Sequence, residues 1–351
     1  MMTRVQWLRI HRSLGLAVAA FLLVQALTGA LLLYRGPAAR LLDPAGMTRH
    51  GHGPIISAGD AITQANRALP GYRVTRIFAP DAKDATWFAQ LDDPDGRTAY
   101  ASVDPAGGDV LRAGGLFHFP FEAALQIHYR LTAGKAGMAV IAFNAVALLV
   151  MAVSGLNYWW PKRNVVKALE IRWKLAPRII LRQAHRTTGV IAAAFLIVQA
   201  TTGLLLIVPE LADTSTPTPP IVAPASAIDR SLALAQRVFP GSSLKDARIS
   251  GGRMIVNFNA PERNARAVHR VIVTIGQPVI VPVSVSATPA DQNRALWMTI
   301  LPIHAGNVIG PIGPALLLVV ALALAALAIS GPLIWWHASA QRRRPTRKVP
   351  A

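Results

Sequence analysis

The chain has 351 residues, of which 52% are apolar, with a formal net charge of +19 and no cysteine. Its mean hydropathy of +0.38 is too high for an ordinary soluble protein of this length, so the composition predicts a membrane protein. The lack of cysteine excludes disulfides, iron–sulfur clusters and covalent attachment of haem through a C-x-x-C-H motif.

Four apolar stretches alternate with longer mixed segments along the chain. Each stretch reaches the ~20 residues that a helix needs to cross a hydrocarbon core about 30 Å thick, and none carries a charge in its interior. In chain order we expect a first transmembrane helix (1–34), an outer domain (35–134), a second transmembrane helix (135–161), a basic loop (162–184), a third transmembrane helix (185–208), a second outer domain (209–307), a fourth transmembrane helix (308–337) and a basic tail (338–351).

The basic residues are unevenly distributed, and their distribution predicts the orientation of the chain. The segment before the first helix, the loop between the second and third helices and the C-terminal tail hold 16 basic residues and one acidic residue. The two long segments are near balance, with 11 basic and 10 acidic residues over 35–135 and 9 and 6 over 209–307. This positive-inside pattern places both termini and the loop in the cytoplasm. It favours contact with membrane lipid over nucleic-acid binding.

The chain repeats itself. Residues 185–206 match residues 11–32 at 14 of 22 positions, with a constant offset of 174. Histidine, serine and tryptophan motifs recur around the second and fourth helices, with the same spacing of 26 residues from histidine to serine. Each outer segment contains an amphipathic helix, a Pro-Gly turn and strand-like alternation, as in a small α+β domain. We therefore expect a membrane α-helical protein with four transmembrane helices from a tandem parallel duplication, and two small α+β outer domains.

The duplication predicts two histidine pairs. Because each copy holds an even number of transmembrane helices, the copies share one orientation and are related by a pseudo-two-fold axis along the membrane normal. This axis places His11 opposite His185 near the cytoplasmic side, and His128 opposite His304 near the outer side. Two facing imidazoles are what a six-coordinate haem iron needs, and helical bundles build such sites from facing helices. We therefore predict two bis-histidine, non-covalent haem sites.

Residues near these histidines complete the predicted sites. Gly15 and Gly189 lie four positions after a histidine on the same helix face, where a small residue suits a flat macrocycle or close helix packing. The segment 132–137 predicts a break in the helical path, which would put His128 above the bilayer. Three arginines beside histidines could pair with haem propionates: Arg12, Arg186 and Arg130. Metal binding is left open for four further histidines: His50, His52, His118 and His337.

The repeated motifs resemble a known family. An H-R-x-x-G motif opens one transmembrane helix, an outer domain follows, and an H…S-G-x-x-x-W-W arrangement closes the next helix, and the whole occurs twice. This arrangement is similar to that of the PepSY-associated transmembrane helix (PepSY-TM) family, and within it to FoxB-type inner-membrane siderophore reductases. The resemblance covers essentially the whole chain. It implies a bacterial inner-membrane protein with PepSY-like periplasmic domains and two b-type haems, held by His11, His128, His185 and His304.

The same resemblance implies a function. It is that of a di-haem reductase, which passes electrons across the membrane to ferric iron in a periplasmic siderophore and releases Fe(II). The chain contains no dinucleotide-binding fingerprint and no phosphate-binding loop motif, so quinol or a cytoplasmic flavoprotein would be the electron donor. Two other functions stay open: a permease component for iron or haem, and a non-redox membrane protein in which PepSY-like domains bind or signal.

Overall fold

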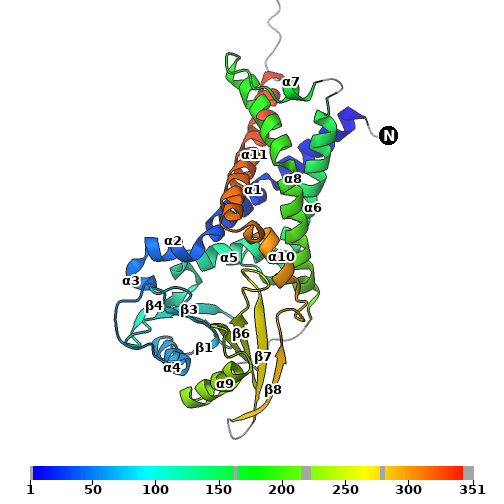
Figure 1. Cartoon of the computed structure of the whole chain (residues 1–351). Helices are drawn as coiled ribbons and strands as arrows, with labels where there is room; N and C mark the ends of the chain where they lie inside the picture. The colour runs from blue at the N-terminus through cyan, green and yellow to red at the C-terminus, as the bar shows by residue number, and fades with distance from the viewer. Residues whose placement is uncertain (1–2, 162–163, 215–222, 277–280, 343–351) are drawn as a thin grey trace, which may run out of the picture. The chain divides into compact units, whose positions relative to one another are not determined.

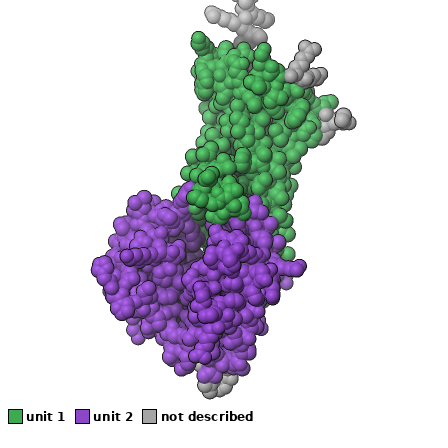
Figure 2. All heavy atoms as spheres, viewed as in Figure 1, with its two compact units in different colours: residues 1–33, 124–212, 304–351 green, residues 34–123, 213–303 purple. Residues whose placement is uncertain are grey.

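The computed structural model describes residues 3–161, 164–214, 223–276 and 281–342. The chain divides into two compact units, which Figure 2 colours separately. The helix unit comprises residues 1–33, 124–212 and 304–351, and the sheet unit comprises residues 34–123 and 213–303. Part of the predicted basic loop (162–163) and most of the predicted basic tail (343–351) lie outside the described residues.

Four long apolar helices dominate the helix unit, which confirms the predicted number of membrane-spanning segments (Figure 1). They are α1 (Arg4–Leu33), α6 (Gly134–Trp159), α8 (Pro177–Ala212) and α11 (Ile312–Arg342). Helix α1 packs against α6 and α11, and α8 packs against the same two helices. The four helices therefore form a closed bundle in which α1 lies diagonally opposite α8.

Apolar side chains fill the interior of the bundle and also cover its outer face. Its central cluster consists of Val18, Leu22, Ala147, Leu148 and Ala200, whereas large apolar side chains such as Phe143 are exposed. A helix that is apolar all round is typical of a membrane span, because lipid covers its outer face. Helix α8 is 36 residues long, longer than the predicted 185–208. It starts at Pro177, a position that suits proline because the first helical N–H has no partner within the helix.

Two short helices carry a histidine in their last turn: α5 (Pro120–Arg130) and α10 (Leu296–His304). After α5 the chain turns sharply into α6, and Leu131 there has a φ of 49°, which is uncommon for a residue with a side chain. A Cβ on Gly137 would lie 1.8 Å from the Arg130 carbonyl oxygen, so the close approach of the two helices requires glycine. The predicted break in the helical path is thus confirmed. Two further short helices lie elsewhere in the helix unit, α7 (Val165–Leu169) and the 3-10 turn η2 (Asn307–Ile309).

The sheet unit contains one eight-stranded antiparallel sheet with helices packed on it (Figure 1). Its first segment supplies α2 (Arg35–Leu42), α3 (Pro44–Met47), α4 (Ala58–Ala68), β1 (Arg73–Phe78), β2 (Trp87–Asp92), β3 (Thr98–Val103), β4 (Val110–Gly115) and the 3-10 turn η1 (Leu116–His118). Its second segment supplies α9 (Ala225–Val238), β5 (Leu244–Ser250), β6 (Arg253–Asn259), β7 (Val268–Ile275) and β8 (Pro282–Thr288). Alternate apolar residues of the strands pack against α4 and α9 in one core, which includes Ile62, Ile77, Leu91, Ile228 and Val256.

The two predicted outer domains share this single sheet. The strand order is β4-β3-β2-β1-β5-β6-β7-β8, so each segment contributes a four-stranded meander and the meanders join through β1 and β5. Ile77 of β1 pairs with Ala247 of β5, and the Gly59 amide of α4 donates to Asp229 of α9 at 2.9 Å. Sequence patterns show each α+β segment but not this pairing. Pairing removes two exposed strand edges, which would otherwise be open to other chains.

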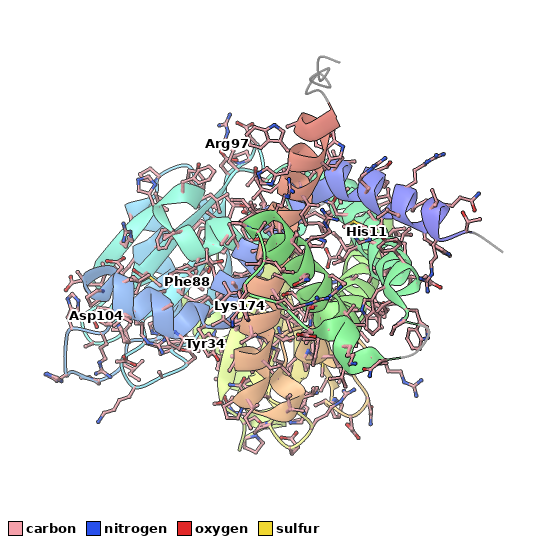
Figure 3. All side chains as sticks on the ribbon, turned by 90° about the horizontal axis from the view of Figure 1, so that it is seen from above. His11, Tyr34, Phe88, Arg97, Asp104 and Lys174 are labelled. Carbon is pink, nitrogen blue, oxygen red and sulfur yellow. The ribbon has the colours of Figure 1, made fainter. Side chains whose placement is uncertain are left out.

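Asp104, labelled in Figure 3, organises the loop that follows β3. Its carboxylate accepts three backbone N–H groups, from His50, Gly51 and Ala106, at 3.0, 3.2 and 2.8 Å. Burial by itself raises the pKa of Asp104, but the three hydrogen bonds outweigh this effect, and the pKa lies below its ordinary value of 3.8.

We expect Asp104→Ala to lower the thermal midpoint of the sheet unit. A hydrogen bond to a charged group contributes about 1.5–3 kcal/mol, and the substitution leaves several N–H donors without an acceptor. A carboxyl whose pKa is lower in the folded state stabilises the fold above its unfolded pKa, and this contribution is lost as the pH falls through the folded pKa. The difference in midpoint between wild type and variant should therefore be full at pH 7 and shrink in acid. A difference independent of pH would contradict the charged-carboxylate interpretation.

Candidate functional site

The structure brings the four repeated histidines together in two pairs within the helix unit. The ring centres of His11 on α1 (labelled in Figure 3) and His185 on α8 are 6.4 Å apart, with an interplanar angle of 86°. The ring centres of His128 on α5 and His304 on α10 are 6.3 Å apart, with an angle of 54°. We call these the inner pair and the outer pair.

The separation within each pair suits a metal ion between the rings. An imidazole nitrogen binds a transition metal at about 2.0 Å, and it lies roughly 1.1 Å from the centre of a five-membered ring with bonds near 1.33 Å. Two imidazoles on opposite sides of one metal ion therefore have ring centres about 6 Å apart. Both observed separations agree with this value.

The inner pair is held by hydrogen bonds from Nδ1 to the helices beside it. His11 Nδ1 lies 2.9 Å from the carbonyl oxygen of Met151 on α6, and Ser154 Oγ is further away at 3.4 Å. His185 Nδ1 lies 2.7 Å from Ser330 Oγ on α11. The two halves of the bundle thus use equivalent helices but different acceptors, a backbone carbonyl in one and a hydroxyl in the other.

The outer pair is held by two threonines at equivalent positions. His128 Nδ1 lies 3.1 Å from Thr28 Oγ1 of α1, and His304 Nδ1 lies 2.8 Å from Thr202 Oγ1 of α8. The ring of His128 thus lies beside the last turns of α1. That His128 lies above the bilayer stays a prediction.

These contacts favour the tautomer in which Nδ1 carries the proton. The hydroxyls of Thr28 and Thr202 each donate to a carbonyl one turn back in their own helix, at 2.6 and 2.7 Å. Ser330 donates to a carbonyl at 3.4 Å in the same way, and the Met151 carbonyl only accepts. Each of these oxygens therefore accepts from Nδ1–H. The lone pair of all four neutral imidazoles is then on Nε2, which is the form that binds a metal ion.

A glycine packs against each of the four histidine rings. A Cβ added to the glycine would lie 3.0–3.5 Å from Cε1 of the facing ring in every case. The contacts pair Gly29 with His128, Gly203 with His304, Gly155 with His11 and Gly331 with His185. Because these positions lack a side chain, the helix backbones approach the rings closely and limit how the rings can turn.

The two glycines predicted to line a cofactor have other neighbours. A Cβ on Gly15 would meet Met151 Cε at 3.4 Å, and one on Gly189 would meet Leu327 Cδ2 at 3.7 Å. Both distances are ordinary helix-packing contacts. Their part in holding a cofactor stays a prediction, whereas the glycines against the rings lie elsewhere in the repeat.

The three predicted arginines have different surroundings. Arg12 is exposed, and the guanidinium of Arg130 lies 4.1 Å above the ring centre of Tyr129. Arg186 donates to the Glu170 carbonyl at 3.1 Å, and its Nε is buried with no hydrogen-bond partner among the described residues. Arg186 therefore has a buried N–H group beside the inner pair that could donate a hydrogen bond to a carboxylate.

The other histidines are placed apart from these pairs. His50, His52 and His118 belong to the sheet unit, and the ring of His337 stacks on Trp336 with centres 6.3 Å apart and an angle of 6°. Within the described ranges, no group of three or more histidine, aspartate or glutamate side chains is placed to hold a metal ion. Among the described residues, the two histidine pairs thus differ from the other histidines, because each pair places two possible metal ligands face to face.

Sequence reasoning did not identify Thr28, Thr202 and Ser330 as histidine partners. A signal was present, since the two threonines are among the 14 identical positions of the repeat and Ser330 belongs to the repeated S-G motif. Small hydroxyl residues in apolar helices are common, and only the fold shows that these three face a ring nitrogen. The Met151 carbonyl leaves no trace in a sequence, because every residue has a carbonyl.

The chain is similar to one known family of membrane proteins. A family model described as "PepSY-associated TM region" matches residues 8–338, a range that includes both histidine pairs. No match to a curated protein was found. The match extends over nearly the whole chain, so the chain belongs to the PepSY-associated transmembrane family.

Proposed function

We propose that the chain is a di-haem reductase of the bacterial inner membrane, which passes electrons across the membrane to ferric iron in a periplasmic siderophore and releases Fe(II). The observation that carries this proposal is the geometry of the two pairs. Each pair has ring centres 6.3–6.4 Å apart, and each of its imidazoles has Nδ1 held by an oxygen atom. Such outer partners are typical of metal-ligating histidines.

The residues present fit haem b. The chain has no cysteine for covalent attachment, and the donor set is four neutral imidazoles, in which His11 and His185 would bind one haem and His128 and His304 the other. Buried N–H groups without a hydrogen-bond partner among the described residues, at Arg186 and Trp159, suit haem carboxylates. Bound haem would supply reversible one-electron chemistry. The protein itself orients the imidazoles and keeps their Nδ1 protons in place.

The proposed orientation follows from the charges. The basic N-terminal segment, loop and tail would lie in the cytoplasm against anionic lipid, and both segments of the sheet unit would lie in the periplasm. The inner pair would then be on the side of a quinol or cytoplasmic flavoprotein donor. The outer pair would be on the side of the ferric siderophore. A tandem duplication in parallel orientation accounts for the presence of one pair at each level.

We expect Ser330→Ala to weaken haem binding at the inner pair, whereas Ser154→Ala should have little effect. Ser330 is the acceptor for His185 at 2.7 Å, but His11 keeps the Met151 carbonyl at 2.9 Å when Ser154 is removed. Loss of such a partner costs about 10- to 100-fold in metal affinity. Haem transfer to apomyoglobin, followed by absorbance, would measure both variants, and equal effects in the two would contradict the assignment.

The proposal is tested by the spectrum and stoichiometry of the purified protein. We expect a sharp Soret band, split α and β bands on dithionite reduction, and about two haems per chain by the pyridine haemochrome assay. Reduced protein mixed anaerobically with ferric chelates should release Fe(II), followed with a ferrous indicator. Protein that is colourless and takes up no added haem would contradict the proposal and favour a permease component or a non-redox binding protein.

A further inference from the structure

A buried amide lies in the apolar middle of the helix bundle. Asn144 on α6 is 2% exposed, and neither its Nδ2 nor its Oδ1 has a hydrogen-bond partner among the residues that the structure describes. An amide taken from water into an apolar environment costs free energy unless it forms hydrogen bonds. The few unpaired buried groups in a native protein therefore point to a bound water, ion or ligand.

A second amide lies on the facing helix. Leu22 of α1 packs in one cluster with Ala147 and Leu148 of α6, and the two helices run antiparallel. One turn further on the same faces are Gln25 on α1 and Asn144 on α6. The Nε2 of Gln25 is also buried and has no partner in the described part of the chain.

The unpaired atoms define the chemistry of the missing partner. They are two N–H donor groups and one carbonyl acceptor. A carboxylate accepts but does not donate, so it would leave Oδ1 of Asn144 unpaired, and a metal ion would leave both N–H groups unpaired. Water both donates and accepts, and a buried water typically makes about three hydrogen bonds. We propose that Gln25 and Asn144 bind one internal water molecule between the two histidine pairs.

The water site exists in one half of the bundle only. The counterpart of Asn144 in the repeat is Val320, which packs in an apolar cluster with Ala192 and Leu196 of α8. The two halves have the same histidines and glycines but differ at this position. At this level the first copy therefore has two amides, Gln25 and Asn144, whereas the second copy has one, Gln199, with Val320 in place of the other.

The site is closer to the outer pair. Gln25 is four residues from Gly29, which packs on the ring of His128, and 14 residues from His11 on the same helix. At the rise of an α-helix these spacings are ~6 Å and ~21 Å. Resting on the proposed function, the water would give the outer haem a more polar environment than the inner one, and such surroundings tune a haem potential.

A double-mutant cycle on the haem-free protein tests the water site directly. We expect Asn144→Val and Gln25→Met each to lower the thermal midpoint, since each leaves the other amide without its bridge. The double variant should be less destabilised than the sum of the two, because the residues act through one molecule. If no water is bound, Asn144→Val removes an unpaired buried amide and raises the midpoint. That result, or additive effects, would overturn the proposal.

Radiolytic labelling in H₂¹⁸O provides a second measurement, made first on the wild-type protein and then on two variants. A bound water should direct ¹⁸O label onto the neighbouring Leu22 or Leu148, and Asn144→Val should abolish this label. Asn157→Val, at an exposed amide of the same helix, is the matched control and should retain it. Absence of label at both leucines in wild-type protein would overturn the proposal.

Redox titration separates this inference from the proposed function. In the haem-loaded protein, Asn144→Val should shift the midpoint potential of the outer haem and leave that of the inner haem unchanged. Val320→Asn, at the equivalent level of the other copy, should also act on the outer haem, with a shift of opposite sign. Equal shifts of both haems would overturn the role of the water in distinguishing them. A wild-type protein that binds no haem would contradict the proposed reductase function. The double-mutant cycle and the ¹⁸O labelling would still test the water site.

Discussion

Alanine at either member of a histidine pair should remove one haem and leave the other. His185→Ala removes one of the two imidazoles of the inner pair, while the outer pair stays intact because its imidazoles are held by Thr28 and Thr202. We expect the haem content to fall from two per chain to one. His128→Ala should also leave one haem per chain, but here the inner haem remains. Its midpoint potential and its α band in the reduced state should differ from those of the haem that remains in His185→Ala.

The pairing is tested by combining substitutions. His11→Ala with His185→Ala should be no worse than either alone, because both act on one site, whereas His185→Ala with His128→Ala should abolish haem binding. His52→Ala, at an exposed histidine of the sheet unit, is the control and should keep both haems. Loss of both haems in every single variant would contradict two independent sites. Pyridine haemochrome content and redox titration give the readout.

The long helices and the histidine pairing are predictable from sequence because both follow from strong, simple signals. Each membrane helix is an uninterrupted apolar run of sufficient length, and the repeat fixes which histidine corresponds to which. Once two copies share an orientation, His11 has only His185 as its equivalent at the same level. The structure adds the distances within each pair.

The joined sheet and the ligand partners are not predictable in the same way. Pairing of β1 with β5 depends on strand edges more than 160 residues apart, and alternation of apolar residues shows a strand but not its neighbour. The break over 132–137 is predicted, but the close approach of α5 and α6 is not, since it depends on the packing of Gly137 against the Arg130 carbonyl. Backbone acceptors such as the Met151 carbonyl depend wholly on how the helices pack.

A valine at Gly29 should eliminate the outer haem and spare the inner one. A Cβ at this position would already lie 3.0 Å from His128 Cε1, closer than carbon atoms normally pack, and the γ-methyl groups of valine need still more room. The ring would have to turn away from Thr28 and lose its Nδ1 hydrogen bond. We therefore expect about one haem per chain for Gly29→Val, with the spectrum and potential of the inner site.

The matched control is Gly189→Ala, at a glycine of the same repeat. Its Cβ would meet only Leu327 Cδ2 at 3.7 Å, an ordinary contact, and alanine is favoured over glycine within a helix by about 1 kcal/mol. This variant should keep the outer haem and have an unchanged or higher thermal midpoint. If Gly189→Ala lost haem while Gly29→Val kept both haems, the prediction would be wrong. The macrocycle would then lie against Gly15 and Gly189, and the glycines that contact the histidine rings would serve helix packing alone.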